Sequence, residues 1–203
     1  MQAQAPSLWL LRHAQPLIAP GVCYGQLDVA ADPQSTAQAA QRFGALQAPG
    51  TTVRISPLQR CVHLARALPV EPASLILDPR LQEMHFGHWE GRSWNDIERN
   101  AVDAWSQDLY NYAPGNGESL RSMLQRVRSA LLYSWQHDSL QGKRNVIWVT
   151  HAGVIRCVQW LLHHGEAQPH AADWNLPAPA FGQSLCLHWE NHVNALHTLQ
   201  ATH

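Results

Sequence analysis

An arginine and two histidines stand directly after apolar runs, where they could act together on a negatively charged group. Residues 8–11 are all apolar and lead into Arg12 and His13, and residues 146–149 are all apolar and lead, after one threonine, into His151. Apolar runs of this length are typical of strands buried on both faces of a parallel sheet. The three side chains are therefore predicted at the carboxyl ends of strands, where open α/β sheets bind their ligands.

A further cation follows a short strand predicted at residues 53–55. Arg60 lies in the first turn of the helix predicted next, close to the carboxyl end of that strand. Because these ends share one edge of a parallel sheet, four side chains are expected in one pocket: Arg12, His13, Arg60 and His151. Two guanidiniums and two imidazoles at short range repel one another unless an anion lies between them. A phosphate group is the natural occupant, because the planar guanidinium matches its oxygens in bidentate fashion.

A carboxyl group beside this pocket would complete a site for phosphoryl transfer. Glu83 lies in a stretch, residues 80–91, in which aromatic residues, histidines and two acids alternate with glycines, and we predict a structured loop there. Glu90, in the same loop, and Glu118 are nearby acids that compete with Glu83 for the role of proton donor.

These groups suffice to write a reaction. His13 would attack phosphorus and form a phosphohistidine while Glu83 protonates the departing alkoxide, and water would then release phosphate with Glu83 as base. The remaining cations would stabilise charge on the transferring group: Arg12, Arg60 and protonated His151. We expect neither a metal nor a cofactor, because the protein itself supplies the positive charge.

The elements around these residues are those of an α/β protein. Strands are predicted at 8–11, 53–55, 75–77 and 146–149, helices at 35–46, 57–68, from Ser93 onward, 120–135 and 154–162, and a hairpin of 185–189 with 196–198. Ser56 with Pro57 is predicted to cap the second helix, and Ser119 the helix that begins at 120. Alternating strands and helices favour a three-layer α/β/α sandwich with a mostly parallel central sheet, formed as a single domain by residues 1–203.

The bulk composition argues against several other classes of protein. With 14% charged residues and a formal net charge of -1, the chain lacks a general basic field, and we expect neither nucleic acid nor membrane as a partner. The 13 histidines are scattered without a metal-ligand spacing, so no metal site is expected. No apolar run approaches the ~20 residues that span a bilayer, and no secretory signal is recognisable. The four cysteines lack a CxxC pair, which favours a cytoplasmic protein.

Five motifs in this order and spacing resemble the histidine phosphatase superfamily, also called the phosphoglycerate mutase-like family. They are residues 11–14, 56–61, 81–91, 117–119 and 149–153. The resemblance covers residues 8 to about 160. It implies a phosphohistidine on His13, a phosphate pocket of Arg12, Arg60 and His151, and Glu83 as proton donor.

Within the superfamily, residues 23–28, 83–90 and 116–118 look most like those of the α-ribazole phosphatases, which act late in cobalamin synthesis. The resemblance implies a substrate-facing loop after the first strand, with three candidate residues that could equally serve to order that loop: Tyr24, Gln26 and Asp28. Two positions depart from the usual pattern. Ala14 replaces the glycine that follows the catalytic histidine, and Ala19 replaces an asparagine typical of mutases.

Three classes of function follow from these features. The first is a phosphomonoesterase for α-ribazole 5'-phosphate or a similar small phosphorylated metabolite, acting as a monomer or homodimer. The second comprises a cofactor-dependent phosphoglycerate mutase and a broad-specificity sugar phosphatase. The third is a silent binding module, which the presence of every charged catalytic position argues against.

Overall fold

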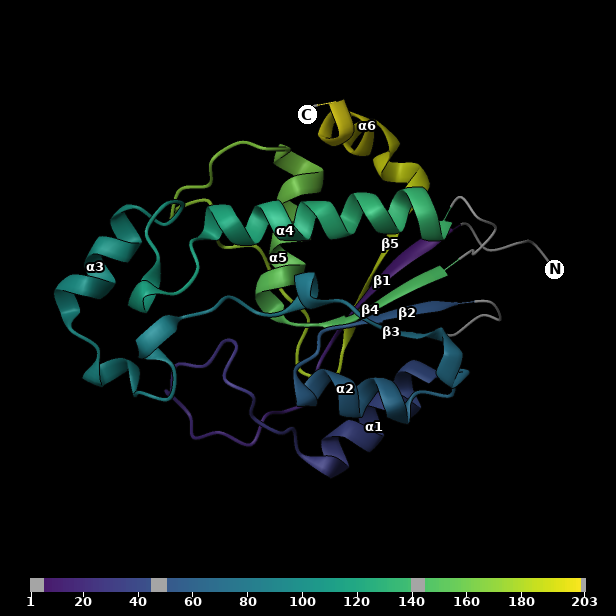
Figure 1. Cartoon of the computed structure of the whole chain (residues 1–203), viewed down its shortest axis with the longest axis horizontal. Helices are drawn as coiled ribbons and strands as arrows, with labels where there is room; N and C mark the ends of the chain where they lie inside the picture. The colour runs from purple at the N-terminus through teal and green to yellow at the C-terminus, as the bar shows by residue number, and fades with distance from the viewer. Residues whose placement is uncertain (1–5, 45–50, 140–144, 202–203) are drawn as a thin grey trace.

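The central element of the fold is a mixed five-stranded sheet. A computed structural model describes residues 6–44, 51–139 and 145–201 (Figure 1). The sheet has the order β3-β2-β4-β1-β5, in which β5 alone runs antiparallel to its neighbour. The strands are β1 (Ser7–Arg12), β2 (Thr52–Ile55), β3 (Leu75–Leu77), β4 (Asn145–Thr150) and β5 (Ser184–His188). His13 and His151 therefore follow two adjacent central strands, β1 and β4.

Helices cover both faces of this sheet, which gives three layers (Figure 1). One face carries α1 (Pro33–Gly44) and α2 (Gln59–Ala67), and the other carries α4 (Leu120–Tyr133), α5 (Ala152–His164) and α6 (Val193–Ala201). A further helix, α3 (Arg99–Gln107), lies beyond the sheet. Short helical turns join these elements: Pro72–Ser74, Pro79–Leu81, Gly87–Trp89, Trp94–Asp96, Pro114–Asn116, Ser134–Ser139 and Trp189–His192. The predicted α/β/α sandwich with a mostly parallel sheet is confirmed.

The two central strands are buried on both faces, as their apolar runs predict. In β1, Leu8 and Leu10 pack with α4 and α5, whereas Leu11 packs with α1 and α2. In β4, Trp148 faces the first of these cores and Val149 the second. Successive side chains of a strand point to opposite faces, so a strand between two helical layers needs apolar residues throughout.

The predicted hairpin at the chain's end is wrong. Its first half is correct, because β5 pairs antiparallel with β1, but residues 189–192 form a helical turn and α6 follows. Leu196 and Leu199, three residues apart, are both buried against the α4 side of the molecule. This spacing places them on one face of a helix, and burial of that face overrides the short alternation seen in the sequence.

Two predicted helix starts also need correction. Ser93 does not open a long helix: its side chain accepts a hydrogen bond from Asn95 N in a single turn, and α3 begins only at Arg99. Ser56 does not cap α2, which begins at Gln59, because its hydroxyl is engaged elsewhere and Asp28 Oδ1 accepts from Gln59 N instead. The Ser119 cap is confirmed, with its hydroxyl accepting from Ser122 N. Residues 45–46 of the first predicted helix lie outside the described residues.

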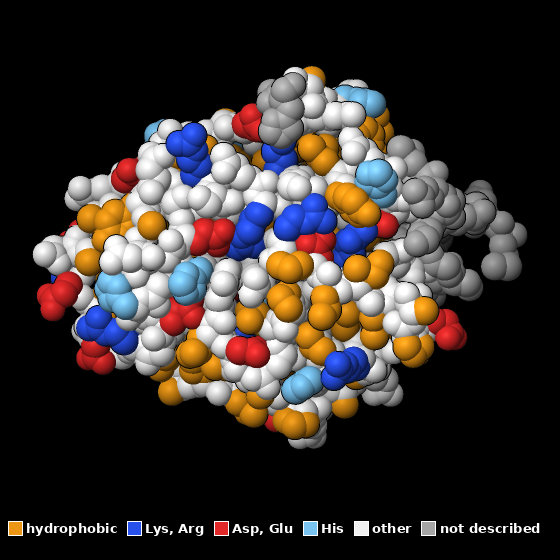
Figure 2. Space-filling view, in the orientation of Figure 1, with side chains coloured by type: hydrophobic (Ala, Val, Ile, Leu, Met, Phe, Trp, Pro, Cys, Tyr) orange, Lys and Arg blue, Asp and Glu red, His pale blue; other side chains and the backbone are white. Residues whose placement is uncertain are grey.

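The surface shows no broad region of one charge on the face in view. Figure 2 shows acidic and basic side chains interspersed on this side, in keeping with the net charge of -1. None of the helices that the structure describes has the length and apolar character needed to cross a lipid bilayer.

Candidate active site

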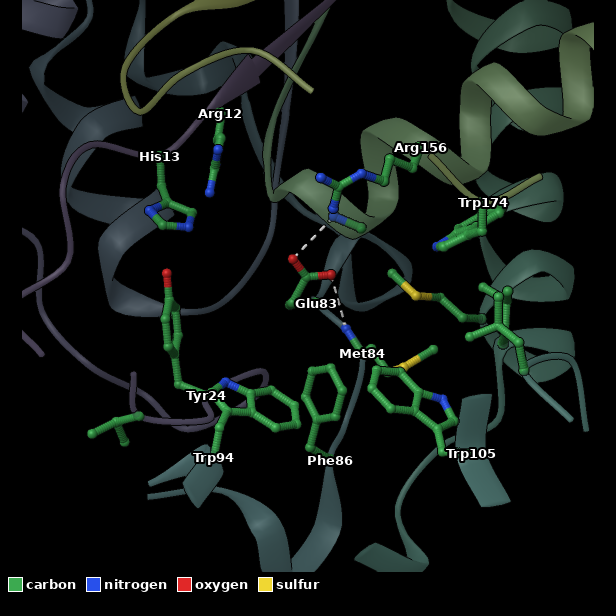
Figure 3. Close-up of a pocket in the computed structure, with 15 residues that line it drawn as sticks. Arg12, His13, Tyr24, Glu83, Met84, Phe86, Trp94, Trp105, Arg156 and Trp174 are labelled. Carbon is green, nitrogen blue, oxygen red and sulfur yellow. Dashed lines mark hydrogen bonds between the residues drawn. The ribbon is translucent and has the colours of Figure 1, made fainter. Parts of the chain in front are cut away.

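A cavity of about 360 Å³ opens at the carboxyl ends of β1 and β4 (Figure 3). Its polar lining consists of Arg12, His13, Tyr24, Glu83 and Arg156. The rest is apolar: Val22, Met84, Phe86, Trp94, Trp105, Leu109, Leu120, Met123, Gly153 and Trp174. In Figure 3, Glu83 lies between the Arg12 and His13 side and the aromatic side. The cavity thus has a cationic half and an aromatic half that share one carboxylate.

His13 is held in the form that a nucleophile requires. It follows the last residue of β1, and its Nδ1 lies 2.7 Å from the carbonyl oxygen of Ala14. A carbonyl only accepts, so Nδ1 carries the hydrogen and Nε2 keeps its lone pair. Burial, and then the Arg60 guanidinium, lowers the pKa of His13 to about 3. His13 is therefore neutral near pH 7.

Arg12 is fixed by the segment that precedes β5. Its Nη1 donates to the carbonyl oxygen of Pro179 at 2.9 Å, and its guanidinium carbon lies 3.9 Å from the ring centroid of Phe181. The Tyr24 hydroxyl hydrogen-bonds to Arg12, and in Figure 3 it points toward the His13 ring. Stacking on an aromatic face orients a guanidinium at little cost in hydration. A segment remote in sequence thus sets the direction of the Arg12 fork.

Arg60 and His151 lie behind the open cavity, and both are fully buried. Arg60 donates through Nη1 to Leu27 O at 2.9 Å and through Nη2 to Gly25 O at 2.5 Å. The His151 ring centroid is 5.1 Å from that of His13. Burial, followed by His13 and Arg60, lowers the pKa of His151 well below its usual value.

Three buried nitrogens of this cluster have no hydrogen-bond partner within the described parts of the chain: Nε of Arg12, Nε of Arg60 and Nδ1 of His151. Buried polar atoms are almost always paired in native proteins, so unpaired ones mark a place for a ligand. All three nitrogens belong to cationic or potentially cationic groups. An anion is the ligand that would satisfy them.

Glu83 is placed at the cavity by two backbone amides. Its Oε1 accepts from Met84 N at 3.1 Å, and its Oε2 accepts from Gly153 N at 3.0 Å in the first turn of α5. A Cβ at residue 153 would lie 2.1 Å from Glu83 Oε1, so only glycine leaves room for the carboxylate there. The position of Glu83 is therefore built into the start of α5.

The two competing acids have structural partners and do not line the cavity. Glu90 accepts from Gln26 N at 3.0 Å and Phe86 N at 2.8 Å, and also from Leu27 N, so it joins the two loops beside the cavity. Glu118 forms a two-pronged ion pair with Arg126 at 2.6 and 2.7 Å. Arg126 also donates to three carbonyls of the loop that carries Glu83, at residues 80, 82 and 83.

Of the three loop residues singled out in the sequence, Tyr24 alone lines the cavity. The Gln26 side chain donates to the carbonyl oxygen of Glu83 at 3.1 Å, and Asp28 Oδ1 accepts from Gln59 N at 2.7 Å at the start of α2. These two side chains hold the loop against its neighbours. A role for the three in substrate binding remains a prediction.

The aromatic half of the cavity is not predicted by the sequence, because large aromatic residues are more often part of a hydrophobic core. Trp94 and Trp105 are nearly parallel, with ring centroids 6.2 Å apart, and Phe86 meets both edge to face. Arg156 reaches the cavity from α5 and donates through Nε to Leu176 O at 2.9 Å. Neither residue type nor spacing in the sequence separates such a wall from a hydrophobic core. Among the described residues, no group of three or more histidines, cysteines or acids could hold a metal ion.

The model of branch 1 of the histidine phosphatase superfamily matches residues 8–201. The chain belongs to this superfamily. This histidine phosphatase is 30% identical over 154 residues to an adenosylcobalamin/alpha-ribazole phosphatase of Salmonella typhimurium, covering 73% of this chain and 75% of the relative. A second relative, from Escherichia coli with the same name, is 34% identical over 111 residues, 51% of either chain.

Solved structures agree with this assignment. A mycobacterial glucosyl-3-phosphoglycerate phosphatase in complex with inorganic phosphate superposes with a TM-score of 0.72 at 27% identity, over 93% of both chains. This histidine phosphatase is therefore a phosphomonoesterase with the fold of its family. The relatives' names give different substrates, so membership of the family leaves the leaving group open.

Proposed function

We propose that the chain is a metal-independent phosphomonoesterase that forms a phosphohistidine on His13 and acts on α-ribazole 5'-phosphate or a similar phosphorylated metabolite. The observation that carries the proposal is the fixed His13 ring, whose Nδ1 is tied to Ala14 O so that Nε2 is free beside the cavity. Arg12, Arg60 and His151 bind the phosphate oxygens. Their unpaired nitrogens support this assignment.

In the first half-reaction, the lone pair of His13 Nε2 forms a bond to phosphorus and the bond from phosphorus to the ester oxygen breaks. Glu83 gives its proton to the departing oxygen, and the hydrogen of His13 stays on Nδ1, which continues to donate to Ala14 O. Binding of the dianion raises the proton affinity of His151, which opposes the effect of burial. Guanidiniums and imidazolium together stabilise the equatorial oxygens of the transferring group.

In the second half-reaction, water enters the space left by the alcohol. The Glu83 carboxylate removes a proton from that water as its oxygen attacks phosphorus, and the bond from phosphorus to Nε2 breaks. Inorganic phosphate leaves, and Glu83 is protonated again for the next ester. One carboxyl group serves both steps because the leaving oxygen and the incoming water occupy the same place.

The aromatic half of the cavity supports a large planar leaving group. Three indoles and one phenyl ring line it, and flat apolar ligands bind such surfaces by stacking and loss of hydrated area. α-Ribazole carries an aromatic heterocycle on its ribose, which suits this lining better than the small polar body of a phosphoglycerate or phosphoserine. The names of the Salmonella and Escherichia relatives support the same choice.

A substrate panel ranked by kcat/KM tests the substrate. It compares α-ribazole 5'-phosphate with ribose 5-phosphate, 3-phosphoglycerate with and without a bisphosphorylated primer, fructose bisphosphates and 4-nitrophenyl phosphate. We expect α-ribazole 5'-phosphate to exceed ribose 5-phosphate by at least about 10-fold, because only the former fills the aromatic half. Equal values would refute the narrow substrate, and primer-dependent isomerisation of 3-phosphoglycerate would replace it with a mutase.

Trapping of the intermediate tests the mechanism separately. Quenching with alkaline detergent during turnover of a ³²P-labelled ester should leave base-stable phosphate on the wild-type chain, which acid then releases, and none on His13→Ala. His88→Ala, which changes an exposed histidine of the loop that carries Glu83, is the control and should label as the wild type does. Equal labelling of His13→Ala and the wild type would exclude His13 as the nucleophile.

A further inference from the structure

Ser56 lies at the carboxyl end of β2 with its side chain against His151. It is fully buried, and its backbone N donates to Val149 O at 3.0 Å, which ties it to the end of β4. Its hydroxyl oxygen lies 2.8 Å from Nε2 of His151. A buried hydroxyl at this distance from a ring nitrogen makes a full hydrogen bond, so Ser56 is the principal partner of that nitrogen.

A second side chain reaches the same nitrogen less closely. Cys61 Sγ is 3.5 Å from His151 Nε2 and 3.6 Å from the carbonyl oxygen of Thr150. Burial raises the pKa of the Cys61 thiol to about 12, so it remains protonated, and it is a weak donor with two acceptors at similar distances. The thiol is therefore a weaker partner of Nε2 than the hydroxyl, which lies 2.8 Å away.

The other ring nitrogen of His151, Nδ1, is buried without a partner among the described residues. Three guanidiniums act on this ring, Arg12 from the β1 end, Arg60 from α2 and Arg126 from α4, and all of them disfavour its protonation. His13 would add to this effect only in its charged form. Glu83 accepts from Gly153 N, two residues after His151. With no anion bound the ring is neutral. A phosphate dianion beside Nδ1 favours the protonated ring and so raises the pKa of His151.

We propose that Ser56 is a positioning residue that lets His151 present an N–H from Nδ1 to the phosphate in both of its protonation states. When the ring is neutral, the hydroxyl donates to Nε2 and thereby selects the tautomer with hydrogen on Nδ1. When phosphate binding protonates the ring, the hydroxyl rotates and accepts from Nε2–H. A hydroxyl is both donor and acceptor, so it serves both states, and an alanine serves neither. This proposal rests on the proposed role of His151 as a phosphate ligand.

The ring nitrogens of His151 report the tautomer directly. ¹⁵N NMR of the wild-type chain, titrated with inorganic phosphate, gives the protonation of Nδ1 and Nε2 once the signals are assigned by their loss in His151→Gln. We expect Nδ1 to carry hydrogen in the phosphate complex. An Nδ1 without hydrogen in that complex overturns the proposal, and this test needs no variant at position 56.

The pH profile of kcat then isolates the role of the hydroxyl. In Ser56→Ala, both states of the ring lose a hydrogen bond, and the protonated ring loses the stronger one because its N–H is charged. His151 therefore gives up its proton at lower pH, and the alkaline limb of kcat moves down by about one pH unit. We expect kcat at pH 7 to fall about 10-fold or more, the loss typical of a buried group left without its partner. Ser56→Thr, which keeps the hydroxyl, restores the limb. An unmoved limb in Ser56→Ala overturns the proposal.

Cys61→Ala is the matched control, because it removes a side chain of similar size that touches the same nitrogen. Its alkaline limb should stay where the wild-type limb lies, and a shift equal to that of Ser56→Ala would assign the effect to packing and overturn the proposal. The NMR titration uses phosphate and needs no turnover. If the wild type hydrolyses no phosphomonoester, the proposed function is refuted. The proposal for Ser56 is then still decided by whether Nδ1 of His151 carries hydrogen in the phosphate complex.

Discussion

Gly153→Ala should lower catalysis without lowering stability. The residue lies in the first turn of α5 and donates its N–H to Glu83 Oε2 at 3.0 Å. A Cβ there would lie 2.1 Å from Glu83 Oε1 and 3.1 Å from Met123 Cε. The first of these distances is impossible for real atoms, so the Glu83 carboxylate must retreat. Its far end is flexible, and the fold can accommodate the change.

The expected loss follows from the size of that displacement. Opening a 2.1 Å contact to the 3.0 Å that real Cβ atoms tolerate moves the carboxylate by about 1 Å. A displacement of this size can cost about 100-fold in rate, within the 10²- to 10⁴-fold that a general acid contributes. Alanine also favours helix over glycine by up to about 1 kcal/mol. The melting temperature should therefore equal or exceed that of the wild type.

The assay compares two leaving groups. An alkyl ester such as α-ribazole 5'-phosphate needs a proton on its leaving oxygen, whereas 4-nitrophenolate departs without one. Gly153→Ala should lower kcat/KM about 100-fold for the alkyl ester and less than about 10-fold for 4-nitrophenyl phosphate. Thermal unfolding of the same samples provides the measure of stability.

A double-mutant cycle with Glu83→Gln identifies the cause. If Gly153→Ala acts by moving Glu83, it should have almost no further effect in the Glu83→Gln background. An equal loss for both esters, or a full 100-fold loss in the Glu83→Gln background, would show that the reasoning from the Cβ contact is wrong.

Three further predictions follow from the site. The pKa of His13 is about 3 in the native chain and 6.5 when the side chain is exposed, so the unfolded chain takes up a proton first as the pH falls. The contribution of His13 to the free energy of unfolding should therefore be full above pH 6.5. It should decrease by about 1.4 kcal/mol per pH unit between pH 6.5 and pH 3. Urea unfolding checks this, and an equally steep drop in His13→Gln would contradict it. Glu90→Gln should raise KM about 10-fold with little change in kcat, because the loop of Tyr24 loses a charged acceptor. Steady-state kinetics measure both constants, with Glu98→Gln, a change at an exposed acid, as the control. An unchanged KM in Glu90→Gln would refute this prediction. Dialysis against a chelator should leave kcat unchanged, and restoration of lost activity by magnesium or zinc would refute the metal-independent mechanism.

The strands and the residues at their ends are predictable from the sequence because a strand between two helical layers must be apolar on both faces. Residues 8–11 and 146–149 meet that requirement, and the structure places His13 and His151 with ring centroids 5.1 Å apart beyond them. The helix at 120 and its Ser119 cap are equally local, since a cap and a periodic apolar face are read within a few turns.

Local sequence patterns predict the wrong element or the wrong partner where contacts with a distant segment decide the outcome. The alternation of residues 185–189 correctly predicts a strand. The spacing of Leu196 and Leu199, in contrast, indicates a helix only because α4 and α5 present an apolar surface that α6 covers. Ser56 has the sequence of a helix cap, yet Asp28 of a distant loop supplies that acceptor and frees the hydroxyl for His151. Both outcomes depend on contacts between segments far apart in the chain.

The sequence by itself determined that two arginines and two histidines would gather at one edge of a parallel sheet, because that follows from strand burial and chain direction. Only the tertiary structure decided which acid would join them. Glu83, Glu90 and Glu118 are alike in type, but they differ in their donors and in where those donors hold them. The amides of Met84 and Gly153 hold the Glu83 carboxylate at the cavity. Glu90 accepts from amides of the two loops that it joins, and Glu118 pairs with Arg126. The aromatic wall of the leaving-group side was decided in the same way, because a tryptophan in a core and a tryptophan beside a cavity have the same local sequence.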